Sequence, residues 1–114
     1  SHLQGILSNL MGNAVKYNRP GGFVQTDITM DSTSLSIRVE DSGIGIAKED
    51  QKRIFERFYR VDKGRSKRVA GTGLGLSIVK HVTEFYGGCV SVESQSGVGS
   101  TFLVQLPAAS LVQK

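Results

Sequence analysis

The chain has 114 residues, a length that suits one compact domain and leaves little room for a second. Its hydrophobic residues (39%) and charged residues (21%) are typical of a globular protein, and no apolar run reaches the ~18 residues that a membrane span needs. A single cysteine excludes both an intrachain disulfide and a thiolate metal cluster, and the net charge is +4.

An amphipathic helix is predicted over residues 3–17, where apolar residues recur at intervals of three and four positions. Asn9, Asn13 and Lys16 lie four and three residues apart, so they form a polar stripe beside the apolar face. The sequence NRPGG at 18–22 ends this helix.

Alternating apolar and polar residues predict two pairs of strands. The strands cover 23–30 and 35–40, and then 89–94 and 101–106. Between the pairs, the apolar pattern predicts a short helix over 48–58 and a longer one over 75–86. Because helices and strands mix without strict alternation, we expect an α+β fold, a two-layer sandwich with a mixed sheet and about three helices on one face.

A basic segment covers residues 57–68, which hold six basic residues and one acidic residue. Such a segment attracts polyanions, and a nucleotide triphosphate and DNA are both candidates. A solvated loop without a ligand is the alternative. Phe58 and Tyr59 are the only aromatic residues among these basic residues, and the segment contains no known nucleic-acid-binding motif. We therefore expect no nucleic-acid partner.

A run of glycines, GTGLG at 71–75, stands immediately before the last predicted helix. It lacks the spacing of a dinucleotide-binding fingerprint, and no lysine follows as in a phosphate-binding P-loop. Glycines let backbone N–H groups at a helix start approach an anion, which predicts a phosphate site. Taken alone, the run fits a flexible hinge almost as well.

A second glycine site, EDSGIGI at 40–46, follows a predicted strand. The Asp41 carboxylate accepts hydrogen bonds only, so it suits a donor such as the exocyclic amine of adenine and disfavours guanine. Gly43 would leave room for a flat base. An Asp-Ser-Gly turn without a ligand is the alternative.

The polar stripe on the first helix offers amide oxygens and a cation. Asn9 and Asn13 carry side-chain amides that need partners beside a buried face. Mg²⁺ accepts an amide oxygen while phosphates and waters complete its shell, and Lys16 would meet phosphate one turn on. Hydrogen bonds between helix and sheet are an equally good explanation of the two amides.

Five segments together carry a family resemblance. They are NLMGNAVKY (9–17), DSGIGI (41–46), FERFYR (55–60), GTGLGL (71–76) and GVGSTF (97–102). In this order they resemble the boxes of the ATP-binding catalytic domain of bacterial sensor histidine kinases, in the superfamily shared with DNA gyrase, the MutL repair ATPases and the heat-shock chaperone ATPase. The resemblance spans residues 3–107 and implies the Bergerat-type ATP-binding fold.

The resemblance implies a role for each matching residue on the first helix and at Asp41. Asn13 would ligate Mg²⁺, and Asn9 would lie near the same metal or the phosphates of ATP. Lys16 would contact phosphate, and Tyr17 would line the nucleotide near its sugar and phosphates. Asp41 would accept the adenine amine.

The remaining boxes would complete the pocket. Thr101 would assist Asp41 through a shared water, and Gly43, Gly45 and Ile46 would shape the base pocket. Arg60 would reach the phosphates or the acceptor protein. Residues 59–72 would form a lid, anchored by Phe55 and Phe58. The phosphate cradle would comprise Gly71, Thr72, Gly73, Leu74, Gly75 and Leu76, with Gly71 also serving as a hinge.

The same resemblance favours phosphoryl transfer over hydrolysis. ATP-hydrolysing members place a water-activating glutamate where this chain has Asn9, and an amide has no useful basicity near neutral pH. Asn9, Lys16 and Arg60 would therefore serve transfer. An autonomous ATPase and a non-catalytic nucleotide-binding module are the alternatives.

The phosphate acceptor is expected on another domain. His2 and His81 are not followed by the acidic residue that the family's acceptor histidine carries. The resemblance implies a histidine-containing dimerisation domain and a response regulator as partners, in a cytoplasmic part of a homodimeric, membrane-anchored parent. We expect one domain over 1–107 and a tail over 108–114, monomeric alone, without the family's preceding strand or acceptor domain.

Overall fold

The computed structural model of the chain describes residues 2–56 and 75–109. Its elements are α1 (His2–Lys16), β1 (Val24–Met30), β2 (Ser34–Asp41), α2 (Lys48–Gln51), α3 (Gly75–Phe85), β3 (Cys89–Gln95) and β4 (Gly99–Pro107). The predicted first helix, last helix and four strands agree with these bounds to within two residues. The basic segment lies outside the described residues.

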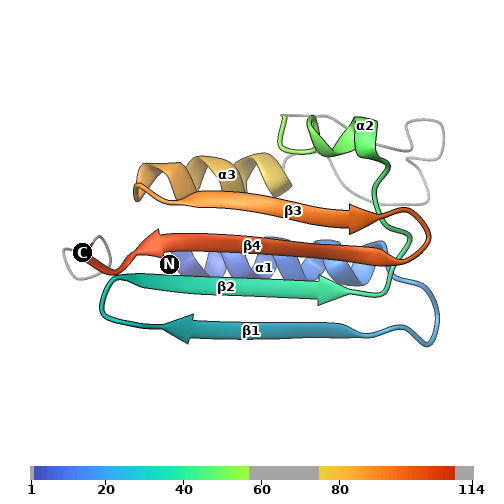
Figure 1. The fold of residues 1–114 in the computed structure, drawn as a ribbon, viewed down its shortest axis with the longest axis horizontal. Helices are drawn as coiled ribbons and strands as arrows, with labels where there is room; N and C mark the ends of the chain where they lie inside the picture. The colour runs from blue at the N-terminus through green and yellow to red at the C-terminus, as the bar shows by residue number, and fades with distance from the viewer. Residues whose placement is uncertain (1, 57–74, 110–114) are drawn as a thin grey trace.

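The four strands form one sheet in the order β1-β2-β4-β3. Figure 1 shows α1 and α3 on the same face of this sheet, so the expected two-layer α+β fold is confirmed. The sheet is antiparallel in all three described pairings rather than mixed. Two of these pairings are within the hairpins β1–β2 and β3–β4, and a short hairpin connection makes its two strands antiparallel. The third pairing joins β2 to β4, one strand from each hairpin.

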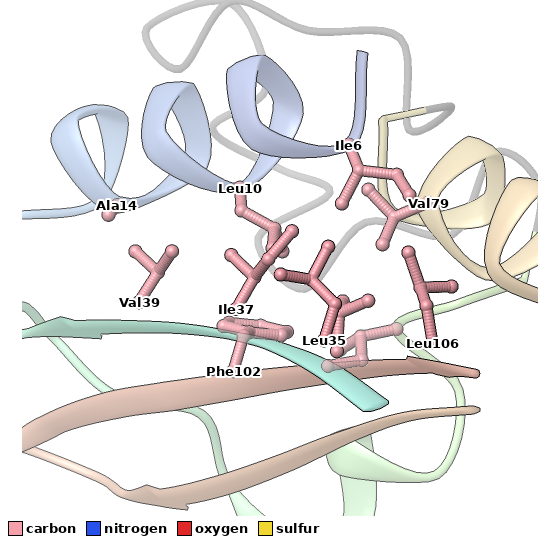
Figure 2. Packing of buried hydrophobic residues seen from close by; sticks show 11 residues of the cluster. Ile6, Leu10, Ala14, Leu35, Ile37, Val39, Val79, Phe102 and Leu106 are labelled. Carbon is pink, nitrogen blue, oxygen red and sulfur yellow. The ribbon is translucent and has the colours of Figure 1, made fainter. Parts of the chain in front are cut away.

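The core lies between α1 and the two central strands (Figure 2). Ile6, Leu10 and Ala14 are spaced by four residues, which puts them on one face of α1, and they are 1%, 1% and 2% exposed. They pack against alternate residues of β2 and β4, and Val79 of α3 joins them. The strand residues of this core are Leu35, Ile37, Val39, Phe102, Val104 and Leu106.

The short helix α2 corrects the prediction of a helix over 48–58. The α-helical pattern ends at Gln51, and Arg53 and Glu56 then donate backbone hydrogen bonds three residues back, to Asp50 and Arg53. Ala47 provides no side-chain cap at the start, so little local energy favours a longer helix. Residues 57 and 58 lie outside the described part of the chain.

Helix α3 ends as predicted, at two glycines. Gly87 has a φ of 81°, which a residue with a Cβ adopts at a cost. Its N–H donates to the Glu84 carbonyl at 2.9 Å, and the Gly88 N–H donates to the Thr83 carbonyl at 2.9 Å. These two bonds form a Schellman motif, which satisfies the last carbonyls of the helix and turns the chain into β3.

We expect Leu10→Ala to lower the free energy of unfolding by about 3 kcal/mol, because it removes a buried side chain and leaves a cavity beneath α1. Urea denaturation followed by circular dichroism measures the change. Met11→Ala is the matched control on the same helix, since Met11 is 39% exposed. A loss for Leu10→Ala no larger than that of the control would contradict this account of the core.

Candidate functional site

Three polar side chains lie along α1 and just beyond its end. Asn9, Asn13 and Tyr17 are spaced by four residues, and the Tyr17 N–H donates to the Asn13 carbonyl at 3.1 Å, so the helical path continues to Tyr17. All three are partly buried. Eight residues at ~1.5 Å per residue give a row roughly 12 Å long. Such a row suits an elongated ligand with different chemistry at its two ends.

Asp41 occupies the end of the row beside Tyr17. It is the last residue of β2 and is 8% exposed. Burial raises the pKa of Asp41 above its ordinary value of 3.8, and hydrogen bonds from the backbone of Gly43 and Ser100 oppose this shift. The Gly43 N–H donates to Asp41 Oδ1 at 2.8 Å. The site thus has one carboxylate that is held by backbone donors and accepts hydrogen bonds.

The loop after Asp41 is packed tightly against neighbouring backbone. The Ile44 N–H donates to the Tyr17 carbonyl at 3.1 Å. A Cβ on Gly43 would collide with that carbonyl and would lie 2.9 Å from Asp41 Oδ1. Gly45 has a φ of 75°, and a Cβ there would collide with the Gln95 carbonyl. At both positions the missing side chain makes room for neighbouring backbone.

Strand alternation separates Thr101 from Asp41. Phe102 is in the core, so Ser100 shares its face of β4 while Thr101 lies on the opposite face. Ser100 is the direct cross-strand partner of Asp41 and is buried. The structure thus places Ser100, and not Thr101, directly beside Asp41 across the sheet. The alternating pattern of the last strand contained this signal, because position 100 shares the face of Phe102.

Thr101 faces a different environment. It lies between Glu40 of β2 and Glu93 of β3 in one cross-strand row. These three residues line a hollow together with Phe23 and Val98. Asp41 and Ser100 also line this hollow, so it reaches the Asp41 end of the row, whereas Tyr17 and the asparagines of α1 do not line it.

The opposite end of the row lies at the start of α3. Asn9 Nδ2 donates to the Gly5 carbonyl one turn back at 2.8 Å. A Cβ on Gly75, the first residue of α3, would lie 3.0 Å from Asn9 Oδ1. The N-terminus of an eleven-residue helix thus abuts Asn9, and its N–H groups favour an anion.

The other predicted site residues differ in how far the structure describes them. Lys16 is exposed, and its Nζ lies 5.9 Å from the centre of the Tyr17 ring. Ile46 and Leu76 are partly buried and pack against the core. Phe55 packs edge-on against Phe102, with ring centres 6.1 Å apart. Arg60, Gly71, Thr72, Gly73, Leu74 and Phe58 lie outside the described residues.

The arrangement offers two recognition ends joined by polar side chains. A buried carboxylate acceptor stands at one end, and a helix N-terminus suited to anions stands at the other. Within residues 2–56 and 75–109, no three His, Cys, Asp or Glu side chains gather as a metal site. Oxygen ligands for a hard cation would come from the amides of Asn9 and Asn13 and from a bound phosphate. In the same described ranges, no helix has the length and apolar content of a membrane span.

Comparison with known proteins gives consistent matches. The family model of histidine kinase-, DNA gyrase B- and HSP90-like ATPases matches residues 1–110. The sensor histidine kinase RppB of Synechocystis is 46% identical over 97% of this chain and 24% of its own length. The sensor-like histidine kinase SenX3 of Mycolicibacterium smegmatis is 48% identical over 89% of this chain and 26% of its own length. The chain therefore spans about a quarter of the length of these relatives.

Solved structures match over nearly the whole chain. The mycobacterial sensor histidine kinase MprB has a TM-score of 0.80 and 32% identity, over 93% of this chain and 72% of that one. Full-length ShkA in complex with AMPPNP has a TM-score of 0.79 and 36% identity, over 93% of this chain and 21% of that one. The second of these structures contains a nucleotide analogue.

Proposed function

The chain belongs to the family of histidine kinase-, DNA gyrase B- and HSP90-like ATPases, and from this membership we propose that it binds Mg-ATP. It then donates the γ-phosphoryl group of ATP to a histidine on a separate dimerisation domain of a parent sensor kinase. The observation that carries the proposal is the row along α1. It joins a buried carboxylate acceptor to a helix N-terminus along a row roughly 12 Å long.

We assign the residues by their place in this row. Asp41 accepts the exocyclic amine of adenine, and Ser100, next to it across the sheet, assists in place of Thr101. Tyr17 lines the middle of the nucleotide. Asn13 holds Mg²⁺, and the metal supplies neutralisation of charge on the triphosphate. The remaining groups for phosphate are Asn9, Lys16 and the first N–H groups of α3, together with the preceding glycine run and Arg60.

The chemistry at Asn9 supports transfer rather than hydrolysis. Its amide nitrogen is engaged with the Gly5 carbonyl, which leaves Oδ1 toward the start of α3. An amide oxygen accepts a hydrogen bond but cannot take a proton from water near neutral pH. Transfer between bound partners depends instead on positioning and charge neutralisation, which this row supplies. An ATPase module is therefore the weaker candidate.

The partners follow from the proposed transfer. His81, in the middle of α3, is exposed but is followed by Val82 rather than by an acidic residue. We propose that the acceptor lies on a histidine-containing dimerisation domain of the same receptor, and that a response regulator then receives the phosphoryl group. The parent would be a homodimer with this domain in the cytoplasm. One catalytic domain over 1–107 with a tail over 108–114 remains our proposal for the organisation of the chain.

Calorimetry with AMPPNP tests the nucleotide part of this proposal. We expect the wild-type chain to bind AMPPNP in Mg²⁺ with a dissociation constant in the micromolar range. In EDTA we expect binding at least fivefold weaker, because the metal neutralises the charge of the phosphates, and each tenfold change in the dissociation constant equals about 1.4 kcal/mol. Incubation with γ-labelled ATP tests the acceptor part, and we expect no stable label on the chain alone. Steady phosphate release would instead support the ATPase alternative, and no binding in either buffer would refute the nucleotide site.

A further inference from the structure

We propose that Arg19 is a positioning residue that holds the adenine end of the site in shape without touching the nucleotide. This inference rests on the proposed function, since it concerns the same pocket. No box of the family resemblance includes Arg19, which stands two residues after the first box. An arginine near a nucleotide site would ordinarily be taken for a phosphate ligand, so its hydrogen bonds decide between the two roles.

The Arg19 guanidinium joins two loops that are distant in sequence. Its Nη2 donates to the Gly43 carbonyl at 2.8 Å and to the Gly97 carbonyl at 2.7 Å. These partners lie 24 and 78 residues along the chain, on the loop after β2 and in the β3–β4 turn. One amino group thus uses both of its hydrogens to connect three segments of backbone.

The local backbone fixes where Arg19 starts. The Gly22 N–H donates to the Arg19 carbonyl at 3.0 Å, and Gly21 has a φ of 80°. With Pro20 before that glycine, this is the pattern of a type II turn. The Arg19 N–H donates to Asn18 Oδ1 at 2.9 Å, and Asn18 Nδ2 donates to the Phe23 carbonyl at 2.9 Å. Little freedom remains in the backbone that carries the guanidinium.

One acceptor of Arg19 belongs to the residue that holds Asp41, and the other belongs to a turn that is tied to the same loop. Gly43 donates its own N–H to Asp41 Oδ1, so its carbonyl and its N–H connect Arg19 to the carboxylate. Gly97 donates its N–H to the Ile44 carbonyl at 2.7 Å, which ties the same turn to the same loop. Without the guanidinium, both carbonyls lose a charged donor, and the loop can move relative to Asp41.

The position of Arg19 speaks against a phosphate contact. The anion-binding end of the row lies at Asn9 and Gly75, whereas Arg19 contacts the loop at the opposite end, beside Asp41. A residue that shapes the base pocket should change the preference for adenine over guanine. A phosphate ligand should change the affinity for both nucleotides equally.

The test compares Arg19→Met with Arg19→Lys. Methionine keeps an apolar stem without donors, whereas the lysine ammonium can still donate to two carbonyls. Arg53→Met is the matched control, because Arg53 is an exposed arginine whose guanidinium pairs with Glu56 at 3.1 Å. Dissociation constants for Mg-ATP and Mg-GTP come from NMR chemical-shift titration, which reaches weak binding. Amide hydrogen exchange at Gly43 and Gly97 is measured in the same samples without nucleotide.

We expect Arg19→Met to weaken ATP binding about tenfold, because one to two charge-assisted hydrogen bonds are lost. GTP binding should stay within about twofold of wild type. Exchange at Gly97 should become faster. Arg19→Lys and Arg53→Met should remain within about threefold of wild type for ATP. Equal weakening for ATP and GTP, or no change for either, would overturn the inference. If the wild type binds neither nucleotide but exchange still responds to Arg19→Met, the proposed function fails while the bridge itself stands.

Discussion

Replacement of Asp41 by asparagine is expected to weaken ATP binding by at least about 100-fold, equivalent to about 2.7 kcal/mol. The carboxylate has only acceptor oxygens, whereas an asparagine amide can direct its NH₂ toward the exocyclic amine of adenine, donor against donor. A buried donor without a partner costs more than the hydrogen bond that it replaces. Calorimetry with Mg-ATP, under conditions that detect binding to wild type, measures the loss.

The same substitution is expected to leave the fold intact and to raise its stability at neutral pH. Burial raises the pKa of Asp41, so the folded chain holds the proton more tightly than the unfolded chain does. The contribution of Asp41 to the free energy of unfolding therefore falls as the pH rises from the ordinary pKa of 3.8 through the raised pKa of the folded chain. Above both pKa values, the ionised carboxylate opposes folding. Asparagine removes that opposition while its Oδ1 can still accept the Gly43 N–H.

Asp31→Asn is the matched control for the pH dependence. Asp31 is exposed, and backbone hydrogen bonds from Thr33 and Ser34 lower its pKa, so its contribution has the opposite sign. That contribution is present above 3.8 and is lost as pH falls through the lowered pKa. Urea unfolding of both variants at neutral and acid pH distinguishes them. An Asp41→Asn chain that bound ATP within tenfold of wild type would contradict the base-recognition role.

The elements and the core could be predicted from the sequence because each depends on local periodicity. The spacing of Ile6, Leu10 and Ala14 is a property of one helix, and the alternation of Leu35, Ile37 and Val39 is a property of one strand. These patterns decide which face is buried without knowledge of the partner. The end of α3 was likewise predictable, since Gly87 supplies the positive φ that the motif requires.

The site could be predicted only as a set of residues, because its geometry depends on contacts between distant segments. The sequence singled out Asp41, Asn9 and Asn13, but it did not indicate that Asn9 abuts the start of α3. Thr101 was assigned by its place in a box, whereas the pairing of Asp41 with Ser100 decides which side chain shares its face. The two hydrogen bonds of Arg19 join residues that are 24 and 78 positions apart in the sequence, and no local pattern indicates such contacts.

The glycines near Asp41 show most clearly that contacts between distant segments could not be predicted from the sequence. Gly43 and Gly45 were assigned to the base pocket because glycines often allow a ligand to approach the backbone, and Gly99 was assigned no role. At each of these positions the backbone that approaches belongs to the chain itself. The ends of β2, β3 and β4 are brought together at these glycines, and the position of Asp41 depends on that close approach.

Gly99→Ala is consequently expected to have the largest effect on stability, a loss of about 3 kcal/mol or more in the free energy of unfolding. Gly99 has a φ of 147°, and a Cβ there would collide with the carbonyl of Asp41, a backbone atom that cannot turn away. To accommodate the methyl group, β4 must separate from β2 at the pair formed by Asp41 and Ser100. ATP binding should fall with the stability, because the carboxylate moves.

Gly97→Ala separates backbone strain from this collision. Gly97 lies in the same turn with a φ of 82°, but a Cβ there would meet nothing within 4 Å. Its cost should be the strain alone, about 1 kcal/mol, and ATP binding should stay within about twofold of wild type. Urea denaturation of the two variants compares them directly. Equal losses would mean that strain accounts for both, and that the close approach of Gly99 to Asp41 has no part in holding the site.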